Sequence, residues 1–219
     1  MVGLDAVRHR FAAVALPSDM TDLRLRVATD DDAAAIADIY RPYVEETAIT
    51  FEETPPDGEA IAGRIADTLE TYPWFVAERD GEVVGYAYGG KLRKRAAYRW
   101  VVELSVYVDR DRQSEGVGSA LYRALIETLD RQGFESAYGV VTLPNPGSVA
   151  FHEAFGFDCV AHLPQAGYKH GEWHDVAWFE RALSERSETP TEPTPFADCR
   201  DAPWLSSVCA AAADSDDTE

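Results

Sequence analysis

Apolar and polar residues alternate along several short stretches of the chain, which is the pattern of strands buried on one face. The first of these stretches is Leu23–Val27. Two later stretches are separated by Asp80-Gly81, a dipeptide that favours a tight hairpin turn. The pattern predicts further strands at Trp74–Glu78, Val83–Tyr88, Tyr98–Val108, Ser136–Thr142, Phe157–Leu163 and Glu172–Ala182.

Apolar residues recur three and four positions apart in the segments between these strands, which is typical of helices with one buried face. Pro42 is expected to kink or end the first helix near Arg41, and Gly156 is placed to terminate the last one. The predicted helices span Thr29–Val44, Gly58–Glu70, Gly116–Asp130 and Ser148–Phe155. Hairpins come first and strands then alternate with helices, so we expect an α/β fold with a mixed sheet covered on both faces.

The chain is long enough for one substantial α/β domain, since 46% of its 219 residues are hydrophobic. We place this folded unit at residues 23–183. Residues 1–22 lack sustained periodicity and are expected to form an N-terminal extension. Residues 184–219 hold nine acids, two bases and four prolines, which predicts an acidic tail with little fixed structure. Pro203-Trp204-Leu205 is a candidate docking point within that tail.

Acidic residues outnumber basic ones by 39 to 20, which gives a formal charge of −19. Phosphate binding needs a basic surface, so this balance argues against nucleic acid as a partner. No apolar run approaches the roughly 18 residues of a membrane span. Cys159, Cys199 and Cys209 provide neither a disulfide framework nor a metal-ligand spacing, so we expect a reduced, soluble, cytoplasmic protein without a metal.

The acid excess is not confined to the tail, because residues 23–183 hold 27 acidic and 16 basic residues. Such a surface repels itself at low ionic strength, since exposed charges interact over about 30 Å at 0.01 M salt but about 3 Å at 1 M. We therefore predict a halophilic protein whose melting temperature rises between about 0.1 and 2 M KCl. A flat or falling melting temperature in calorimetry would leave the acids as an aid to solubility.

The segment from Val106 to Ser119 carries the strongest chemical signal, because a strand leads into Gln113-x-x-Gly116-x-Gly118 and a helix follows. Glycines let a ligand approach the backbone, and the first amides of a helix point outward at the positive end of its dipole. The turn therefore suits a pyrophosphate. Its spacing differs from a dinucleotide fingerprint and from a P-loop. A tight strand-to-helix turn without a ligand is the alternative.

This spacing resembles the acyl-CoA pyrophosphate loop of the GCN5-related N-acetyltransferase (GNAT) superfamily. A second block, Asn145-x-x-Ser148-x-x-x-His152-Glu-x-x-Gly156-Phe157, is similar to that superfamily's second cofactor-contacting helix, which often carries a tyrosine at the position of His152. The resemblance implies acetyl-CoA as cofactor and the GNAT acyl-CoA N-acyltransferase fold, a mixed, mostly antiparallel central sheet flanked by helices. It also implies the cofactor-binding residues Val106, Tyr107, Val108, Gln113, Ser114, Glu115, Gly116, Val117, Gly118, Ser119, Asn145 and Ser148.

A closer resemblance is to phosphinothricin N-acetyltransferases and the related enzymes that act on methionine sulfone and sulfoximine. The most distinctive match is Gly167-Tyr-Lys-His-Gly-Glu-Trp-His-Asp-Val176, and Thr50-Phe51 and Tyr72-Pro-Trp74 match as well. This resemblance implies a small amino-acid-like substrate and a homodimer. Two features depart from it. Glu115 is expected to weaken pyrophosphate binding unless it points outward, and Asn145-Pro146-Gly147 replaces the usual Asn-Asp-Pro.

Glu103 is the candidate general base, because an ammonium group must lose a proton before it can attack a thioester. Glu103 lies in an otherwise apolar run, where burial would raise its pKa; an acid on the solvent face of a strand is the alternative. Backbone N–H groups near Leu104–Val106 are candidate oxyanion donors. The superfamily's acid position falls on His152, which is therefore a candidate proton donor to the thiolate or a second base, with a structural role as the alternative.

The basic run Lys91-Leu-Arg93-Lys94-Arg95, followed by Tyr98, is the dense group of cations in this acidic chain. Arginine binds carboxylate and phosphinyl oxygens in a planar, bidentate manner, and a solvated loop is the alternative. The resemblance places this loop beside the acceptor and Phe51 opposite it. The predicted substrate-binding residues are therefore Phe51, Lys91, Arg93, Arg95 and Tyr98. We assign His170, Trp173 and His174 to packing, the pocket lining or a dimer contact.

The sequence thus predicts an acetyl-CoA-dependent N-acetyltransferase that acts on the amino group of a small amino-acid-like substrate. Acetylation of another amine, such as a polyamine or a protein N-terminus, is the first rival, and an acidic acceptor mouth would favour it. A CoA-binding regulatory domain without catalysis is the second. Glu103 and His152 argue against that loss of catalysis, whereas Glu115 favours it.

Overall fold

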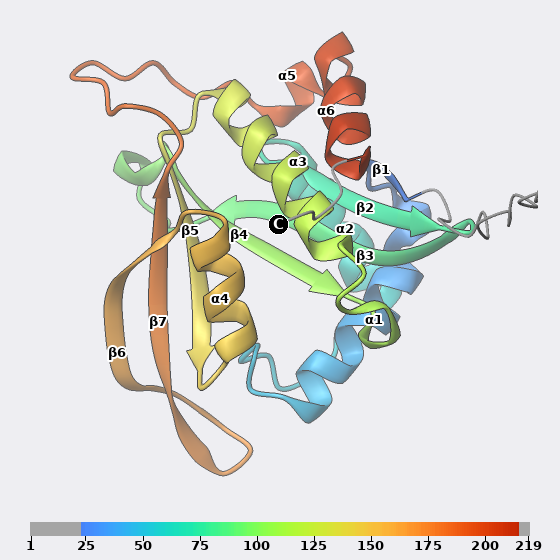
Figure 1. Cartoon of the computed structure of the whole chain (residues 1–219), viewed down its shortest axis with the longest axis vertical. Helices are drawn as coiled ribbons and strands as arrows, with labels where there is room; N and C mark the ends of the chain where they lie inside the picture. Colours follow the sequence, from blue (N-terminus) through green and yellow to red (C-terminus); the bar gives the residue numbers. More distant parts are fainter. Residues whose placement is uncertain (1–22, 215–219) are drawn as a thin grey trace, which may run out of the picture.

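The computed structural model describes residues 23–214 of the chain. One sheet forms in the order β1-β2-β3-β4-β5-β7-β6, in which β4 and β5 are parallel and the other neighbours are antiparallel (Figure 1). The strands are β1 (Arg24–Val27), β2 (Trp74–Arg79), β3 (Glu82–Lys91), β4 (Val101–Val108), β5 (Ser136–Leu143), β6 (Asp158–Lys169) and β7 (Glu172–Ala182). The predicted mixed, mostly antiparallel sheet is confirmed.

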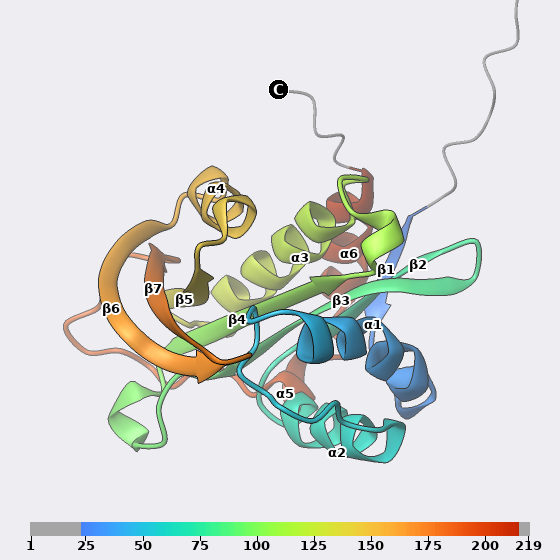
Figure 2. The same ribbon diagram turned by 90° about the horizontal axis from the view of Figure 1, so that it is seen from below.

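Helices cover both faces of the sheet, as predicted. Figure 2 shows α1 and α2 on one face and α3 and α4 on the other. The helices are α1 (Ala33–Glu46), α2 (Gly58–Leu69), α3 (Val117–Gln132), α4 (Pro146–Ala154), α5 (Phe196–Cys199) and α6 (Pro203–Asp214). The core lies between these layers, where Phe75, Leu121 and Phe179 have at most 2% of their surface exposed. Within residues 23–214, every helix is too short or too polar to cross a membrane.

Helix α1 continues through Pro42 to Glu46, so the expectation that it could end near Arg41 is wrong. A proline in a helix interior removes one backbone hydrogen bond. Tyr43 and Val44 follow it directly and are both buried. Burying such side chains contributes about 1.5–3 kcal/mol each. The packing of α1 on the sheet therefore outweighs the missing bond.

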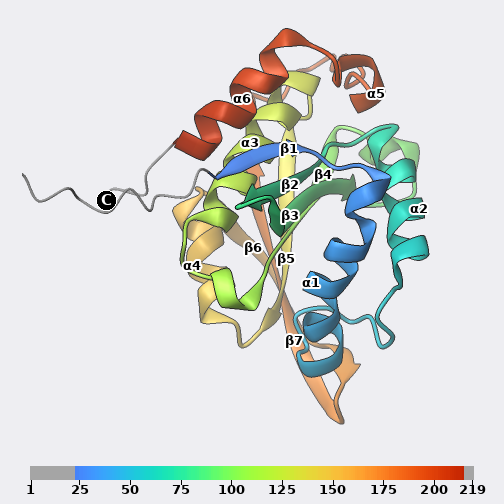
Figure 3. The same ribbon diagram turned by 90° about the vertical axis from the view of Figure 1, so that its right-hand side faces the viewer.

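Residues 184–214 contradict the expectation of a tail with little fixed structure. Beyond β7 the chain forms α5 and α6, and α6 lies beside β1 and α3 (Figure 3). The Thr194 amide donates to the Gln132 carbonyl at 2.7 Å, and the Gln132 side chain donates back to the Thr194 carbonyl at 2.8 Å. The candidate docking point does dock, because Leu205 is 4% exposed. Apolar residues three and four apart give α6 its buried face: Leu205, Val208, Cys209 and Ala212.

The C-terminal segment is expected to contribute to global stability through Phe196. Its side chain is fully buried and meets the Phe75 ring edge-on, with the ring centroids 6.3 Å apart. Phe196→Ala should lower the free energy of unfolding by about 3–5 kcal/mol in urea titrations. Ser207→Ala, on the exposed side of α6, is the matched control and should change it by less than about 0.5 kcal/mol. Equal stabilities of the two variants would contradict the role of this segment in the core.

The two ends of the described chain meet beside β1. A groove of about 670 Å³ between β1 and α6 is lined by both Leu23 and Asp214. The predicted N-terminal extension, residues 1–22, lies outside the described residues, as do residues 215–219.

Candidate active site

The site is built where β4 and β5 separate. These parallel strands pair from Val101 and Ser136 as far as Leu104 and Gly139, although β4 continues to Val108 and β5 continues to Leu143. The strands diverge beyond that point (Figure 1). Helix α3 follows β4 after a turn of eight residues, and α4 follows β5 after two residues. Both helix N-termini stand beside the opening. A cavity of about 490 Å³ lies there.

Ten of the twelve predicted cofactor-binding residues line this cavity, namely Val106, Tyr107, Val108, Gln113, Ser114, Gly116, Gly118, Ser119, Asn145 and Ser148. The other two do not. The Val117 side chain is buried in the core, 1% exposed. The Glu115 carboxylate forms an ion pair with Arg79 on β2, which neutralises it beside the turn. We expected Glu115 to weaken pyrophosphate binding unless it points outward, and the positive charge of Arg79 opposes that weakening.

The turn before α3 takes the shape that the glycine spacing suggested. Ser114 and Gly116 both have left-handed backbones, with φ of 66° and 76°. The first helical hydrogen bond runs from the Ala120 amide to the Gly116 carbonyl, so the amides of Val117, Gly118 and Ser119 have no carbonyl ahead of them within the helix. These amides and the positive end of the α3 dipole suit a pyrophosphate.

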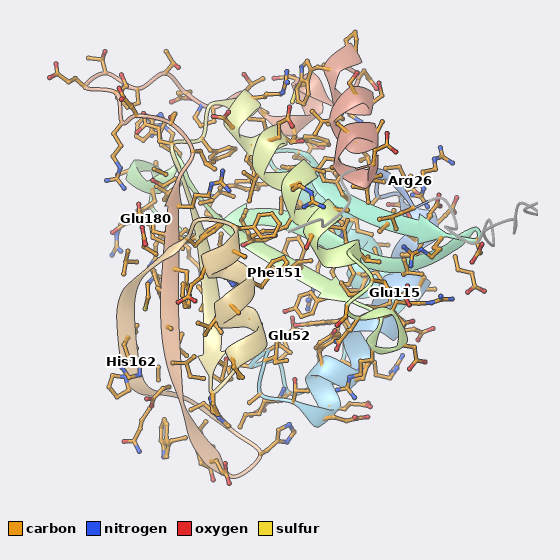
Figure 4. The ribbon with its side chains drawn as sticks, in the orientation of Figure 1. Arg26, Glu52, Glu115, Phe151, His162 and Glu180 are labelled. Carbon is orange, nitrogen blue, oxygen red and sulfur yellow. The ribbon has the colours of Figure 1, made fainter. Side chains whose placement is uncertain are left out.

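Gln113 has a structural partner rather than a free side chain. Its Nε2 donates to the Tyr43 hydroxyl at 3.0 Å, and that hydroxyl donates to the Val108 carbonyl at 2.6 Å. These bonds tie α1 to the end of β4. On the other side of the cavity, the Asn145 side chain accepts from the Ser148 amide at 3.0 Å, so α4 begins at Pro146 instead of Ser148. Figure 4 shows Phe151 of α4 directed toward α3.

Glu103 lies on β4, level with Gly90 of β3 and Tyr138 of β5, and is half-buried. Burial raises the pKa of its carboxyl group above the usual range, and the nearby Arg93 partly opposes that rise. The Arg93 guanidinium is 4.4 Å from the centroid of the Trp178 ring on β7. Of the predicted substrate-binding residues, Arg93 is therefore the one that the structure brings to Glu103.

The remaining predicted substrate-binding residues are spread along the edge of this region. Lys91 is the last residue of β3, and Arg95 and Tyr98 follow it; all three are exposed. Phe51 lies on the loop between α1 and α2 and is 41% exposed. Tyr98 belongs to a short 3-10 turn, so β4 begins at Val101 rather than at Tyr98 as predicted.

His152 lies on the α4 side of the sheet and is 8% exposed. Its Nδ1 is 2.7 Å from the Ser148 carbonyl, which can only accept, so Nδ1 carries the proton and Nε2 carries a lone pair. Nε2 lies so close to Gly139 that a Cβ there would be 2.1 Å away. Burial lowers the pKa of the ring. His152 is therefore neutral at neutral pH.

The chain matches the acetyltransferase (GNAT) domain family over residues 25–178. It belongs to the GNAT acetyltransferases. It is 40% identical over 173 residues to a phosphinothricin N-acetyltransferase from Streptomyces viridochromogenes, which covers 79% of this chain and 92% of the relative. It is 34% identical over 166 residues to an L-methionine sulfoximine/L-methionine sulfone acetyltransferase from Salmonella typhimurium, which covers 75% of this chain and 97% of the relative.

Solved GNAT structures agree with these relatives. The chain is similar to a GNAT superfamily phosphinothricin acetyltransferase from Sinorhizobium meliloti in complex with AcCoA, with a TM-score of 0.74 and 37% identity over 78% of this chain and 94% of that one. The predicted fold, enzyme class and acetyl-CoA cofactor are confirmed. The cavity beside the free amides of α3 fits the pyrophosphate of that cofactor.

One cluster on the face of the sheet that α1 and α2 cover, which we call the Glu103 face because Glu103 also lies near Tyr88 there, was not predicted. The Arg64 guanidinium of α2 donates two hydrogen bonds to the Glu52 carboxylate, at 2.7 and 2.9 Å. The Tyr40 hydroxyl lies 2.7 Å from that of Thr50 and donates to Glu52 at 3.2 Å. Figure 4 shows Glu52 on the loop that follows α1. These residues come from separate elements, so no sequence spacing marks them. Groups of three His, Cys, Asp or Glu side chains fit to hold a metal ion are absent from residues 23–214.

Proposed function

We propose that the protein acetylates the α-amino group of a small amino-acid-like substrate of the phosphinothricin, methionine sulfoximine or methionine sulfone type. The position of Glu103 carries this proposal. It is a half-buried carboxylate with a raised pKa, and it stands beside an arginine next to the point where β4 and β5 separate. A base and a carboxylate-binding cation side by side match the two charged groups of an amino acid. The names of the relatives support the same class of acceptor.

Proton removal from the substrate and stabilisation of the oxyanion each have a candidate group in this chain. Bound acetyl-CoA supplies a thioester as the acyl donor. Glu103 takes the proton of the substrate ammonium, directly or through one water. Beyond Leu104 the β5 side of β4 lacks a strand partner, so an amide of residues 105–108 is free to stabilise the negative charge that develops on the carbonyl oxygen.

The catalytic role that we propose for His152 is more limited than the one that the sequence suggested. Its Nδ1 proton is engaged by the Ser148 carbonyl and its Nε2 is unprotonated, so a neutral ring has no free proton to donate to a thiolate. A second base, or support for the packing of α4, agrees better with this geometry. His152 also contacts the Phe179 ring, with the ring centroids 5.4 Å apart.

The pH dependence of activity is expected to report on Arg93. Glu103 must be ionised to act as a base, so activity falls as the pH drops through its pKa. Because Arg93 lowers that pKa, Arg93→Ala should move the acidic limb of log(kcat/KM) to higher pH. Loss of a charge-assisted hydrogen bond should also raise the acceptor KM about 10- to 100-fold. Arg95→Ala is the control, and in this variant the acidic limb of log(kcat/KM) should remain at the same pH as in the parent. An unmoved limb in Arg93→Ala would separate Arg93 from Glu103.

The acceptor class is tested by CoA release. The protein is assayed with amino acids, their phosphinic, sulfone and sulfoximine analogues, and polyamines, at fixed acetyl-CoA. We expect kcat/KM to be highest for the amino-acid analogues. Higher values for polyamines would replace the proposed acceptor by a cationic amine. No release with any amine would favour the regulatory CoA-binding domain.

We also propose that the protein is a homodimer that works in the reducing cytoplasm. The β6–β7 ribbon forms an edge of the sheet and carries large exposed apolar side chains: Val160, Leu163, Tyr168 and Trp173 are between 38% and 60% exposed. Such a group on one edge supports association of two copies. All three cysteines are free thiols, which supports a reducing compartment.

A further inference from the structure

The tip of the β6–β7 hairpin lies against the loop between α1 and α2, residues 47–57 (Figures 1 and 2). Lys169 makes the central contact. Its Nζ donates to the Val44 carbonyl at 2.7 Å and to the Thr50 carbonyl at 2.8 Å. His170 adds a contact at 3.2 Å from its Nε2 to the Thr47 carbonyl. Two elements more than a hundred residues apart in sequence are thereby held together.

The Lys169 ammonium is buried, with 5% of the residue exposed, and burial lowers its pKa. A buried lysine is costly unless its charge has partners. Val44 belongs to the last turn of α1, whose final carbonyls have no partner within the helix. One ammonium therefore pairs with one of the final carbonyls of α1 and holds Thr50, the residue before Phe51. Glu52 and Glu53 stand close enough to support its charge.

Phe51 rests directly on the backbone of Gly167 at the start of the hairpin tip. A Cβ at position 167 would lie 2.1 Å from Phe51 Cζ and 2.2 Å from its Cε2. No atom pair of this kind approaches so closely, so any side chain there would displace the ring. Gly167 does not have a positive φ angle, so the glycine is required for space and not for its backbone angle.

The loop between α1 and α2 reaches both halves of the active site. Ile49 lines the cofactor cavity. Glu52 belongs to the cluster with Tyr40 and Arg64 on the Glu103 face. Phe51 stands between these two residues in the chain. Glu52 and Glu103 both lie close enough to Tyr88 for their charges to affect its hydroxyl group, so a displacement of this loop would change the surroundings of Glu103.

We propose that the hairpin tip sets acceptor selectivity, with Gly167 and Lys169 as positioning residues that hold Phe51 at the acceptor site. Phe51 limits the acceptor side chain, and its place is determined by the bare backbone of Gly167 beneath it and by the anchor of Lys169 at Thr50. The inference rests on the proposed function, because it needs an amino-acid-like acceptor beside Phe51.

A double-mutant cycle between Gly167→Ala and Phe51→Ala tests the contact. Acceptor kcat/KM is measured for amino-acid analogues of short and long side chain, and the acetyl-CoA Kd is measured by calorimetry. Gly167→Ala should raise the acceptor KM at least tenfold and change the short-to-long ratio of kcat/KM at least fivefold, with the Kd within twofold. In the Phe51→Ala background, the added Gly167→Ala should change both by less than twofold, because the displaced ring is gone. Gly63→Ala, where an added methyl meets nothing within 4 Å, is the matched glycine control.

Variants of Lys169 provide a second test of the inference that does not depend on Gly167 variants. Lys169→Met removes the ammonium and leaves two carbonyls without a donor, so it should lower the melting temperature and shift the short-to-long ratio in the same direction as Gly167→Ala. Lys169→Arg keeps the charge and should restore part of the ratio. If Lys169→Met and Gly167→Ala both lower the melting temperature but leave the short-to-long ratio of kcat/KM unchanged, this inference is overturned and the proposed function is not affected. Wild-type protein that acetylates no analogue would overturn the proposed function and this inference with it.

Discussion

Glu103→Gln is expected to lower kcat by about 10²–10⁴-fold, because the amide keeps the shape of the side chain but cannot accept a proton from the substrate ammonium. The affinity for acetyl-CoA should stay unchanged, since Glu103 is not among the residues that line the cofactor cavity. Initial rates at saturating acceptor and acetyl-CoA, between about pH 6 and 9, measure the effect.

The matched control is Glu180→Gln. Glu180 lies two strands away on β7, level with Tyr138, and its carboxylate pairs with Arg186 at 2.6 Å (Figure 4). Glu180 is a partly buried carboxylate near the site, but it does not lie where a base could reach the substrate ammonium. Its replacement should therefore leave kcat within about twofold of the parent. A fall of less than tenfold in Glu103→Gln would mean that the proton leaves by another route.

Gly118→Leu is expected to raise the acetyl-CoA KM at least tenfold, which corresponds to about 1.4 kcal/mol. Gly118 lines the cavity in the first turn of α3. A Cβ at this position would meet Val108 at 3.5 Å and Phe151 at 3.8 Å, which are ordinary contacts, so the fold can accept a side chain. The larger leucine would occupy the space beside the free amides. Leucine is also a better helix former than glycine, so α3 should not be weakened.

Gly118→Ala serves as the graded control and should have a smaller effect than leucine. Calorimetric titration with CoA separates binding from catalysis. An unchanged affinity in Gly118→Leu would remove the turn before α3 from the cofactor site.

The local parts of the site could be predicted from the sequence, because they depend on neighbouring residues. The turn from Gln113 to Gly118 needs a left-handed residue just before the helix starts, and Gly116 marks that position, although the left-handed Ser114 leaves no such mark. The apolar run around Glu103 likewise indicated a carboxylate in an apolar strand. The sequence motifs thus identified ten residues of one cavity.

Long-range features left no such mark. The pair of Glu52 and Arg64 depends on how α2 packs beside the loop after α1, and the tautomer of His152 depends on the Ser148 carbonyl. The prediction for the C-terminal segment was wrong for another reason. Its overall content of proline and acid resembles that of a disordered tail, while the apolar spacing of α6 is visible only within the alanine-rich stretch from Leu205 to Ala212.

The groove between β1 and α6 has a consequence for engineering. Leu23 and Asp214 both line it, so residues 23–214, the part of the chain that the structure describes, start and finish at one place. Domains with adjacent ends tolerate circular permutation when new ends are opened in an exposed turn. A short linker across this groove, with new ends at the Asp80-Gly81 turn between β2 and β3, would leave the strands and both walls of the cofactor cavity uncut. Partners fused directly at Leu23 and at Asp214 would likewise extend from a single corner of the molecule.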